Sequence, residues 1–418
     1  MAKRETVLRA LTSLRQNTVI QVLFVLPFLF GLLAKLNRSK PWFGDYQAVA
    51  CAGLKDQAHQ PFYDLYMNCP GMHASVFVYI PAVAHVTAWF ERVLSEPGLF
   101  YLYAGLFVVS VLALVMVPLK WAPGKLSDKL PFAVFLGSAA VTWGNIAVLM
   151  HAAVLGAALL FETAPWLFVA VVALVASVKP VFLTYLAVVL LARMSWTRRL
   201  LLTGAGVVAG LAPTVVFTLT DPGTAYQWAH LLKHFVYDVT PGSGFYGWIG
   251  FFGLRGDTPV AEAAYLIYAG AMMLSALAAA DRLKLDGRER LWLGLSVAGL
   301  LIPRIMSQDV FLLAPGLVMI AQRAVAVAGA EPVTPLEKVR DFLLRQGPYI
   351  VFSFCVLALA FGFIQHSRYS NPLALLGLSL YLIGLGVALW LGERTADARR
   401  PQPWSVLGAP TVNSETQA

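Results

Sequence analysis

Long apolar runs, each close to the length of a membrane-crossing helix, dominate this chain. A helix needs about 20 apolar residues to cross the roughly 30 Å hydrocarbon core of a bilayer. Of the 418 residues, 59% are hydrophobic and 13% are charged, whereas a soluble domain carries about 25% charged residues. The polar residues are therefore too few to cover a soluble protein of this size. Several runs contain Pro or Gly, which membrane helices tolerate. The sequence predicts an all-α polytopic membrane protein.

The runs predict about twelve transmembrane helices in a single domain over residues 1–391. The predicted spans are 18–36, 74–92, 98–118, 131–143, 146–161, 166–191, 200–220, 260–280, 291–303, 309–322, 348–365 and 372–391. Four of them are short, and they are either half-helices or pairs bent at Gly144-Asn145 and at Pro303 to Asp309. Two connections are large, at 37–73 and 221–259. The polar, Pro-containing tail at 392–418 is predicted to be disordered in the cytoplasm.

The net charge of +9 does not indicate nucleic-acid binding, because the basic residues form short clusters between apolar runs. That pattern is typical of the positive-inside rule. With both termini in the cytoplasm, 19 of the 31 Lys and Arg lie on the cytoplasmic side and 11 on the other, with Lys179 inside a span. Both large loops are then external. The exception is the outer placement of Lys120, Lys125 and Lys129. Either the span count is off by one there, or these lysines meet lipid phosphate.

The first apolar run, Thr18 to Leu36, follows the basic segment Met1 to Asn17. A cleaved signal peptide is the alternative to a first span. The span is favoured because the run is long and no small-x-small cleavage site follows it.

Two of the three cysteines, Cys51 and Cys69, fall in the first external loop, whereas Cys355 lies in a span. An oxidising compartment would permit a disulfide between the two loop cysteines. Two free thiols is the alternative.

Asp45 is the first candidate for chemistry. It follows the first predicted span by a few residues and stands among the aromatic residues Trp42, Phe43 and Tyr46. Aromatic side chains favour the membrane interface. A partly desolvated carboxylate there would have a raised pKa and could act as a general base. A solvated loop carboxylate or a helix cap is the alternative.

Two cationic residues are candidates for an anion site. Lys179, before Pro180, lies near the middle of the predicted 166–191 span, where a lysine costs at least about 2.5–3.5 kcal/mol and usually faces a cavity or a partner. Snorkelling to the interface is the alternative. Arg304 lies in the turn from Pro303 to Asp309 and could hold a phosphate with two hydrogen bonds. An Arg304–Asp309 ion pair that only fixes the turn is the alternative.

A third cluster, His230, His234 and Asp238, has a spacing of four and four residues in the second large loop. Side chains at this spacing share one helical face and can bind a metal. No third strong ligand is evident, and the neighbouring Tyr226 and Trp228 favour an interfacial helix, so we expect no metal site.

Standard motifs of soluble enzymes are missing from the sequence. It contains no phosphate-binding Gly-rich loop ending in Lys-Ser/Thr, no HExxH, no GxSxG and no DxD. We therefore expect no ATP, no metal-chelated nucleotide sugar and no cofactor. A group transfer would use a lipid-linked donor on the external side.

Several of these pieces, in their order, resemble the GT-C superfamily of membrane glycosyltransferases, and specifically glycosyltransferase family 87. The resemblance covers about Asp45 to Pro315. The matching pieces are Gly44-Asp45-Tyr46, Gln60-Pro61-Phe62-Tyr63, Tyr79-Ile80-Pro81, Gly144-Asn145, Val178-Lys179-Pro180 and the Pro303 to Asp309 turn before Pro315. That family includes mannosyltransferases that use polyprenol-phosphate mannose. Where the family usually has Gln, this chain has Asn145. Where the family often has an aromatic residue and a His in the turn, this chain has Gln308-Asp309.

The resemblance implies a GT-C fold and an inverting transfer of a hexose, with mannose the commonest donor sugar, from a polyprenyl-phosphate donor. The acceptor would be a lipid-linked molecule or a glycan on the periplasmic face of the inner (plasma) membrane. Asp45 would be the catalytic base, while Lys179 and Arg304 would bind the donor phosphate. Residues expected to contact substrate are Tyr46, Asn145, Gln308, Asp309 and His234.

Two other classes of function fit the spans. Twelve spans suit a secondary transporter or a lipid flippase, in which Lys179 would serve a substrate or a coupling ion. The large external loop that carries Asp45 argues against this class. A scaffold without catalysis is the third class, and it leaves a lysine inside a span unexplained.

Overall fold

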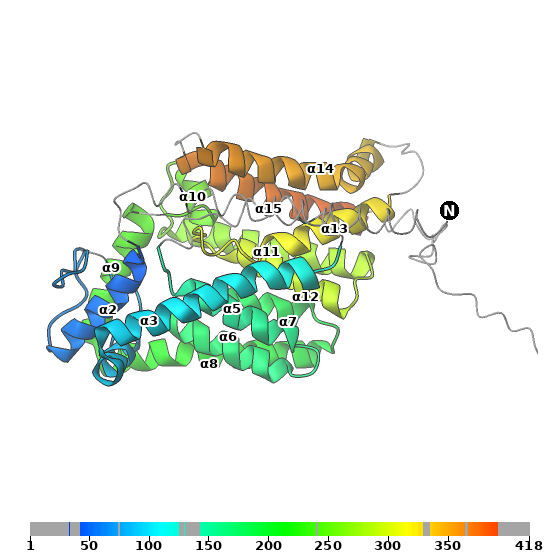
Figure 1. The fold of residues 1–418 in the computed structure, drawn as a ribbon. Coiled ribbons are helices and arrows are strands. Elements are labelled where there is room, and N and C mark those ends of the chain that lie inside the picture. Colours follow the sequence, from blue (N-terminus) through cyan, green and yellow to red (C-terminus); the bar gives the residue numbers. More distant parts are fainter. Residues whose placement is uncertain are drawn as a thin grey trace, which may run out of the picture.

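The computed structural model describes residues 33, 42–73, 76–124, 129, 143–239, 241–328, 335–363 and 367–391, and within them it is helical without a strand. Figure 1 shows the long helices side by side, with α2, α9 and α10 gathered at one end. The elements are α2 (Gly44–Gln57), α3 (Pro81–Trp121), α5 (Ala147–Leu159), α6 (Pro165–Val178), η2 (Pro180–Leu186), α7 (Ala187–Leu191), α8 (Trp196–Thr220), α9 (Pro222–His234), η3 (Phe235–Val239), α10 (Phe245–Gly250), α11 (Pro259–Arg282), α12 (Gly287–Leu301), α13 (Ala314–Ala326), α14 (Pro335–Phe363) and α15 (Ser367–Leu391).

Four helices in the described residues are long and apolar enough to cross a membrane: α3, α8, α11 and the Pro372–Leu391 part of α15. The apolar side chains of α3, α8 and α11 point largely outward, since 28%, 17% and 28% of their most apolar stretches are buried, whereas 61% of that of α15 is buried. An apolar surface of this extent is expected of helices that face lipid rather than water. The predicted α-helical membrane character is thus supported, while the count of twelve spans stays a prediction.

The predicted spans 74–92 and 98–118 fall on either side of a kink within one element, α3. Residues from Pro81 onward form one long helix, α3, which is broken at Ser95 by a left-handed φ of 61°. The first half of α3 packs against α2, where Gln57 donates to Ala88 O at 3.0 Å and to Glu91 Oε2 at 3.0 Å. Because the polar groups of this stretch bind α2, its first half belongs with the first loop.

The predicted 166–191 span is also not a single helix. It folds back on itself at Lys179, with α6 before this residue and η2 followed by α7 after it. Pro180 is the physical reason, because proline disfavours the helical conformation of the residue before it. Lys179 is accordingly extended, with φ −138° and ψ 94°. Lys179 therefore lies at the tip of a helical hairpin rather than in the middle of a straight span.

Contacts between helix ends define a second end of the bundle, opposite α2 and α9. Arg288, at the start of α12, bonds Trp121 O at the end of α3, and Arg290 donates to Leu191 O of α7 at 3.2 Å. Lys129 donates to Pro118 O, Leu119 O and Ala122 O, and so caps the end of α3. A lysine suits a helix C-terminus, because free carbonyls carry partial negative charge there. Lys120 and Lys129 thus lie at this second end and not beside α2.

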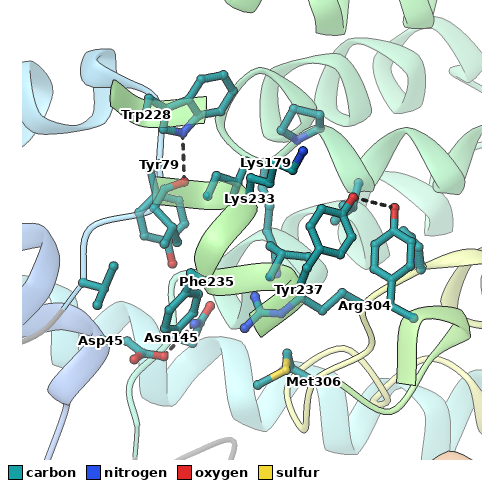
Figure 2. Close-up of a pocket in the computed structure, with 18 of the residues that line it drawn as sticks. Asp45, Tyr79, Asn145, Lys179, Trp228, Lys233, Phe235, Tyr237, Arg304 and Met306 are labelled. Atoms are coloured by element: carbon teal, nitrogen blue, oxygen red, sulfur yellow. Dashed lines mark hydrogen bonds between the residues drawn. The ribbon is translucent and has the colours of Figure 1, made fainter. Parts of the chain in front are cut away.

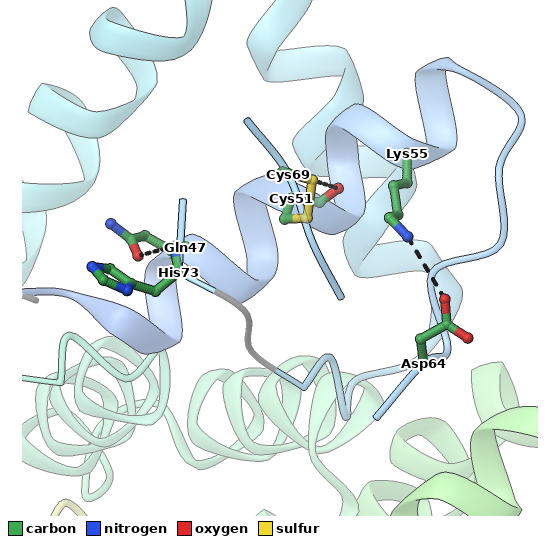
Figure 3. The surroundings of a disulfide bond; sticks show 6 residues. All are labelled: Gln47, Cys51, Lys55, Asp64, Cys69 and His73. Atoms are coloured by element: carbon green, nitrogen blue, oxygen red, sulfur yellow. Dashed lines mark hydrogen bonds and ion pairs between the residues drawn. A yellow bond between two sulfur atoms is a disulfide. The ribbon is translucent and has the colours of Figure 1, made fainter. Parts of the chain in front are cut away.

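The first loop folds into a compact unit on α2. Cys51 and Cys69 form a disulfide with Cα atoms 5.7 Å apart, which confirms the paired alternative. Figure 3 shows that the bond joins α2 to the loop that follows it, near the ion pair between Lys55 and Asp64 (3.7 Å). Phe62, Phe77 and Met67 are buried beneath these residues. The disulfide therefore fixes the loop against α2, the helix that carries Asp45 in its first turn.

The second large loop, predicted at 221–259, contains α9, η3 and α10 and packs on two other segments. Trp228 Nε1 of α9 donates to Val78 O at 3.1 Å, and the backbone N–H groups of Ser243 and Tyr246 donate to Ile305 O and Pro303 O. It therefore joins the segment before α3 to the connection between α12 and α13. The predicted span 18–36 (apart from Leu33), the span 131–143 (apart from Trp143) and the tail 392–418 lie outside the described residues.

Candidate active-site cavity

A cavity of about 730 Å³ lies at the end of the bundle formed by α2, α9 and the connection between α12 and α13. Its volume falls in the range of small-molecule sites, roughly 300–1,000 Å³. Five residues predicted from the sequence line it: Asp45, Asn145, Lys179, Arg304 and Gln308. Figure 2 shows Asp45 and Asn145 together on one side, with the guanidinium of Arg304 extending toward them from the other.

Asp45 is held at the start of α2 by contacts with the segment before α5. Its backbone N–H donates to Trp143 O at 2.9 Å, and its Oδ2 accepts a 2.6 Å hydrogen bond from Asn145 Nδ2. The preceding Phe43 has a left-handed φ of 58° and no side-chain cap serves this helix start. Trp143 O takes over part of that role, because it satisfies one of the free N–H groups of the first turn.

Asn145 carries out two tasks at once. Its Oδ1 accepts from the backbone N–H of Ala147 at 2.9 Å in the first turn of α5, which leaves Nδ2 to donate to Asp45. The two bonds together fix the orientation of the amide. Gly144, just before it, has φ +63° and its backbone oxygen accepts from Tyr103 Oη at 2.6 Å. The position of the Asp45 carboxylate therefore depends on a tight turn that glycine at position 144 allows.

The surroundings of Asp45 favour its protonated form more than water does. Burial raises the pKa of its carboxyl above the ordinary 3.8, against the hydrogen bond from Asn145 and the positive charges of Lys179 and Arg304, which lower it. A carboxylate of raised pKa is a stronger base than one in water. Asp45 thus has the electrostatic setting of a general base.

Lys179 reaches the cavity from the tip of the hairpin between α6 and η2. Its Nζ lies 3.4 Å from Asp309 Oδ1 and 5.8 Å from the centre of the Phe182 ring. The side chain is 22% exposed, whereas that of Asp309 is fully buried. The ammonium therefore faces the cavity with a carboxylate behind it.

Arg304 lies in the connection between α12 and α13, and its backbone neighbours are held by the second large loop. Gly242 and Gly244 approach Ile305 O and Pro303 O so closely that a Cβ at either position would lie 2.7 Å and 2.8 Å from these oxygens. The guanidinium stacks over Phe235 of η3 at 5.0 Å. Stacking on the ring fixes the plane of the guanidinium.

Asp309 was expected to contact substrate, and it instead lies behind the cavity wall. Besides Lys179, its Oδ1 contacts His151 Nε2 at 3.1 Å and its Oδ2 accepts from the Met306 N–H at 2.9 Å. Burial opposes ionisation, but Lys179, His151 and the Met306 N–H more than offset it and lower the pKa of the carboxyl to about 2. Asp309 is therefore an ionised buried carboxylate in the connection before α13.

Tyr46 and His234 do not line the cavity, contrary to the prediction. Tyr46 packs its ring 4.6 Å from that of Tyr103 and is 4% exposed. His234 pairs with Asp238 at 2.9 Å, while its neighbours Lys233 and Phe235 do line the cavity. On a helix, adjacent positions point about 100° apart. Tyr46 and His234 thus lie in segments that reach the cavity, but on faces that do not line it.

Several lining residues were not predicted as site residues, among them the aromatic residues Tyr79, Trp143, Trp228, Tyr237 and Tyr246. Aromatic side chains are so common in this chain that none of them carries a signal by itself. His151, which contacts Asp309, did carry one, because an ionisable residue inside an apolar run is a functional-site hypothesis in its own right.

The cluster of His230, His234 and Asp238 is not assembled as a metal site. The ring of His230 stacks on Tyr226 at 6.1 Å, and Asp238 pairs with His234 and with Arg255 at 3.2 Å. Among the residues that the structure describes, no group of three His, Cys, Asp or Glu could hold a metal ion.

The cavity therefore combines the buried Asp45 carboxylate of raised pKa with three cationic side chains, Lys179, Lys233 and Arg304, inside walls rich in aromatic and aliphatic side chains. This arrangement can remove a proton on one side and hold an anion on the other. Comparisons of the chain with protein-family models, with curated proteins and with solved structures find no match.

Proposed function

We propose that the chain is an inverting glycosyltransferase of the inner (plasma) membrane. It would move a hexose, with mannose as the first candidate, from a polyprenyl-phosphate donor to a lipid-linked or glycan acceptor on the external face. One observation carries this proposal. Asp45, with its raised pKa, shares a single cavity with Lys179 and Arg304, as a base and a phosphate site must in a one-step displacement.

The distribution of charge supports an external position for the cavity. Basic residues gather at the opposite end of the bundle, at the end of α3, between α7 and α8, between α11 and α12, and around the start of α14. They are Lys120, Lys129, Arg193, Arg198, Arg199, Arg282, Lys284, Arg288, Arg290, Arg323, Lys338, Arg340 and Arg345. Positive residues favour the cytoplasmic side. In this proposal only the part of α3 after Ser95 crosses the membrane, so Lys120 and Lys129 lie on the cytoplasmic side. The Cys51–Cys69 disulfide is expected in an oxidising compartment outside the cytoplasm.

The proposed reaction balances without a cofactor. The Asp45 carboxylate takes the proton from an acceptor hydroxyl while that oxygen forms a bond to the anomeric carbon of the donor sugar. The bond from that carbon to the phosphate oxygen breaks, and the electron pair leaves with polyprenyl phosphate. Attack and departure on opposite faces invert the anomeric centre. Lys179 and Arg304 stabilise the charge that develops on the phosphate, and the proton on Asp45 passes to water.

The rest of the lining is suited to such substrates. Asn145, Gln308 and Ser307 offer hydrogen bonds for sugar hydroxyls, and Trp143 and Trp228 offer flat apolar faces. Aliphatic residues beside Lys179 offer a surface for the first isoprene units, namely Val178, Pro180, Val181 and Val236.

Reconstitution of the purified protein tests the proposal. Proteoliposomes receive radiolabelled polyprenyl-phosphate mannose, glucose or galactose, together with lipid and glycan acceptors extracted from a strain that lacks the gene. We expect one of these sugars to move to an acceptor and polyprenyl phosphate to be released in equal amount. Uptake or flipping of the labelled donor with no product formed would instead support a transporter or flippase.

A further inference from the structure

A chain of four side chains runs from the cavity wall into the core. Lys179 Nζ lies 3.4 Å from Asp309 Oδ1, which in turn lies 3.1 Å from His151 Nε2. On the far side of the imidazole, His151 Nδ1 lies 2.6 Å from Tyr185 Oη. Only Lys179 among the four lines the cavity. The side chains of Asp309 and His151 are 0% and 1% exposed, and Tyr185 is fully buried.

The partners decide where the protons lie in this chain. Nε2 of His151 faces a carboxylate oxygen, so Nε2 carries the hydrogen and donates it to Asp309. In a neutral imidazole Nδ1 is then the acceptor, and Tyr185 donates its hydroxyl hydrogen to it. Each hydrogen bond in the chain therefore points toward the Asp309 carboxylate.

The carboxylate is held on both of its oxygens. Oδ2 accepts from the Met306 N–H at 2.9 Å, while Oδ1 takes His151 and Lys179. Phe182 covers the group, with its ring 4.7 Å from that of His151 and 5.8 Å from the Lys179 ammonium. A buried charge with this many partners has little freedom to move.

Lys179 needs such a counter-charge because of its other neighbours. Several charged and titratable groups act on it or line the same cavity. They are Asp45 from α2, Tyr79 from the segment before α3, His151 from α5, Tyr185 from η2, Lys233 from α9, Tyr237 from η3, Tyr246 from α10, Asp257 from the segment before α11, Glu262 from α11, and Arg304 and Asp309 from the connection between α12 and α13. Arg304 and Lys233 repel an ammonium. Asp45 is negative only until it takes a proton. Asp309 is the permanent negative charge in contact with Lys179.

We infer that Asp309 is a positioning residue that holds the Lys179 ammonium charged and fixed at the cavity wall, with His151 and Tyr185 orienting the carboxylate. The ligand held by Lys179 is a phosphate monoester or diester. Its assignment to a polyprenyl-phosphate donor rests on the proposed function, but the anion site itself does not.

Binding of a phosphate probe as a function of pH tests this inference without any sugar transfer. The probe is farnesyl phosphate, titrated by calorimetry into the full-length protein in nanodiscs between pH 6 and pH 10, with inorganic phosphate in parallel. Tighter binding of farnesyl phosphate would identify a lipid-linked ligand, and equal binding a free phosphate.

In Asp309→Asn the lysine keeps a hydrogen-bond partner and loses its counter-charge. A buried ammonium without a counter-charge gives up its proton more easily. We expect affinity at pH 6 within about threefold of wild type, and an alkaline loss of affinity that begins about one pH unit or more lower than in wild type. Tyr185→Phe is expected to move this limb in the same direction by a smaller amount. A profile for Asp309→Asn that runs parallel to wild type would overturn the inference.

A second variant covers poor folding of Asp309→Asn. Arginine stays charged at every pH of the experiment, so Lys179→Arg, alone or combined with Asp309→Asn, should bind farnesyl phosphate with no alkaline limb. An alkaline limb that survives in Lys179→Arg would show that another group causes it, and would also overturn the inference. If the limb behaves as expected and no sugar is ever transferred, the inference stands and the proposed function fails. If sugar is transferred but the alkaline limb of Asp309→Asn matches that of wild type, the proposed function stands and the inference fails.

Discussion

Asn145 Nδ2 donates a 2.6 Å hydrogen bond to Oδ2 of Asp45, a residue 100 positions earlier in the chain. The bond joins the start of α2 to the start of α5, since the same amide accepts from Ala147 N–H through Oδ1. It also stabilises the ionised form of the carboxylate, because a donated hydrogen bond favours the charged state. The amide is therefore both a helix cap and a control on the basicity of Asp45.

Removal of that amide should change the pH dependence of the reaction. Burial raises the pKa of Asp45 above 3.8 and the Asn145 hydrogen bond lowers it. The transfer rate therefore rises with pH as Asp45 loses its proton, and in Asn145→Ala this acid limb should move to higher pH. The pH profile of kcat/KM measures it. An unmoved limb would show that another group sets it.

The same raised pKa affects stability. Since the folded state binds the Asp45 proton more tightly than the unfolded state, the stabilisation from Asp45 is fully present below its unfolded pKa of 3.8 and is lost as pH rises through the folded-state pKa. Asp45→Asn removes the titrating group. This variant should therefore lose less thermal stability than wild type as the pH rises across that window.

Gly144 should be intolerant of any side chain. Its φ is +63°, and a Cβ there would lie 2.3 Å from Cδ1 of Phe43. A left-handed residue with a side chain costs about 1–2 kcal/mol, and displacement of Phe43 would shift Asp45. We expect Gly144→Ala to lower kcat by at least about tenfold. Gly156→Ala in α5, where a Cβ meets nothing within 4 Å, is the matched control and should leave kcat unchanged. Equal effects of the two changes would contradict this explanation.

Arg304 should contribute mainly to donor affinity. A hydrogen bond to a charged group is worth about 1.5–3 kcal/mol, so Arg304→Gln should raise the KM for the polyprenyl-phosphate donor roughly 10–100-fold. Arg255→Gln is the control, since Arg255 pairs with Asp257 at 2.9 Å and Asp238 at 3.2 Å and does not line the cavity. Initial rates against donor concentration measure both. An Arg304→Gln variant with an unchanged donor KM would remove Arg304 from the phosphate site.

The disulfide should stabilise the loop that carries Asp45. Cys51 and Cys69 are 18 residues apart, and closing a loop of this size contributes about 3 kcal/mol. Alkylation under denaturing conditions, read by mass spectrometry, should label Cys355 alone, and all three cysteines after reduction. The double variant Cys51→Ser/Cys69→Ser should unfold at a lower temperature, whereas labelling of all three cysteines without reductant would contradict the pairing.

The helical class of the fold could be predicted from the sequence because long apolar runs leave a chain few alternatives. Two breaks could not be read from hydrophobicity alone. Ser95 interrupts α3 with a left-handed φ of 61° inside an otherwise helical pattern. Lys179 ends α6 because Pro180 follows it, a local signal that the sequence did contain. A hydropathy average over an apolar run shows neither of these two breaks.

The candidate site was predicted in its segments better than in its side chains. Asp45, Asn145, Lys179, Arg304 and Gln308 all line the cavity, because each lies at the start of a helix or in a connection between helices. The faces of short helices were not predictable, since they depend on tertiary packing. The inward direction of Asp309 also depends on tertiary packing, since its buried carboxylate lies against the Lys179 ammonium and the His151 imidazole.

Sugar transfer by Asp45→Asn, compared with wild type, tests the central claim most directly. The change removes the base and keeps the shape of the side chain, while Asp64→Asn in the same loop, at a side chain that is 56% exposed, serves as the control. Rates are measured in proteoliposomes under saturating donor and acceptor, with farnesyl phosphate binding as a check that each variant is folded. The account predicts that Asp45→Asn loses at least about 100-fold in transfer rate and still binds the probe, and that Asp64→Asn matches wild type. Transfer by Asp45→Asn at the wild-type rate would contradict it.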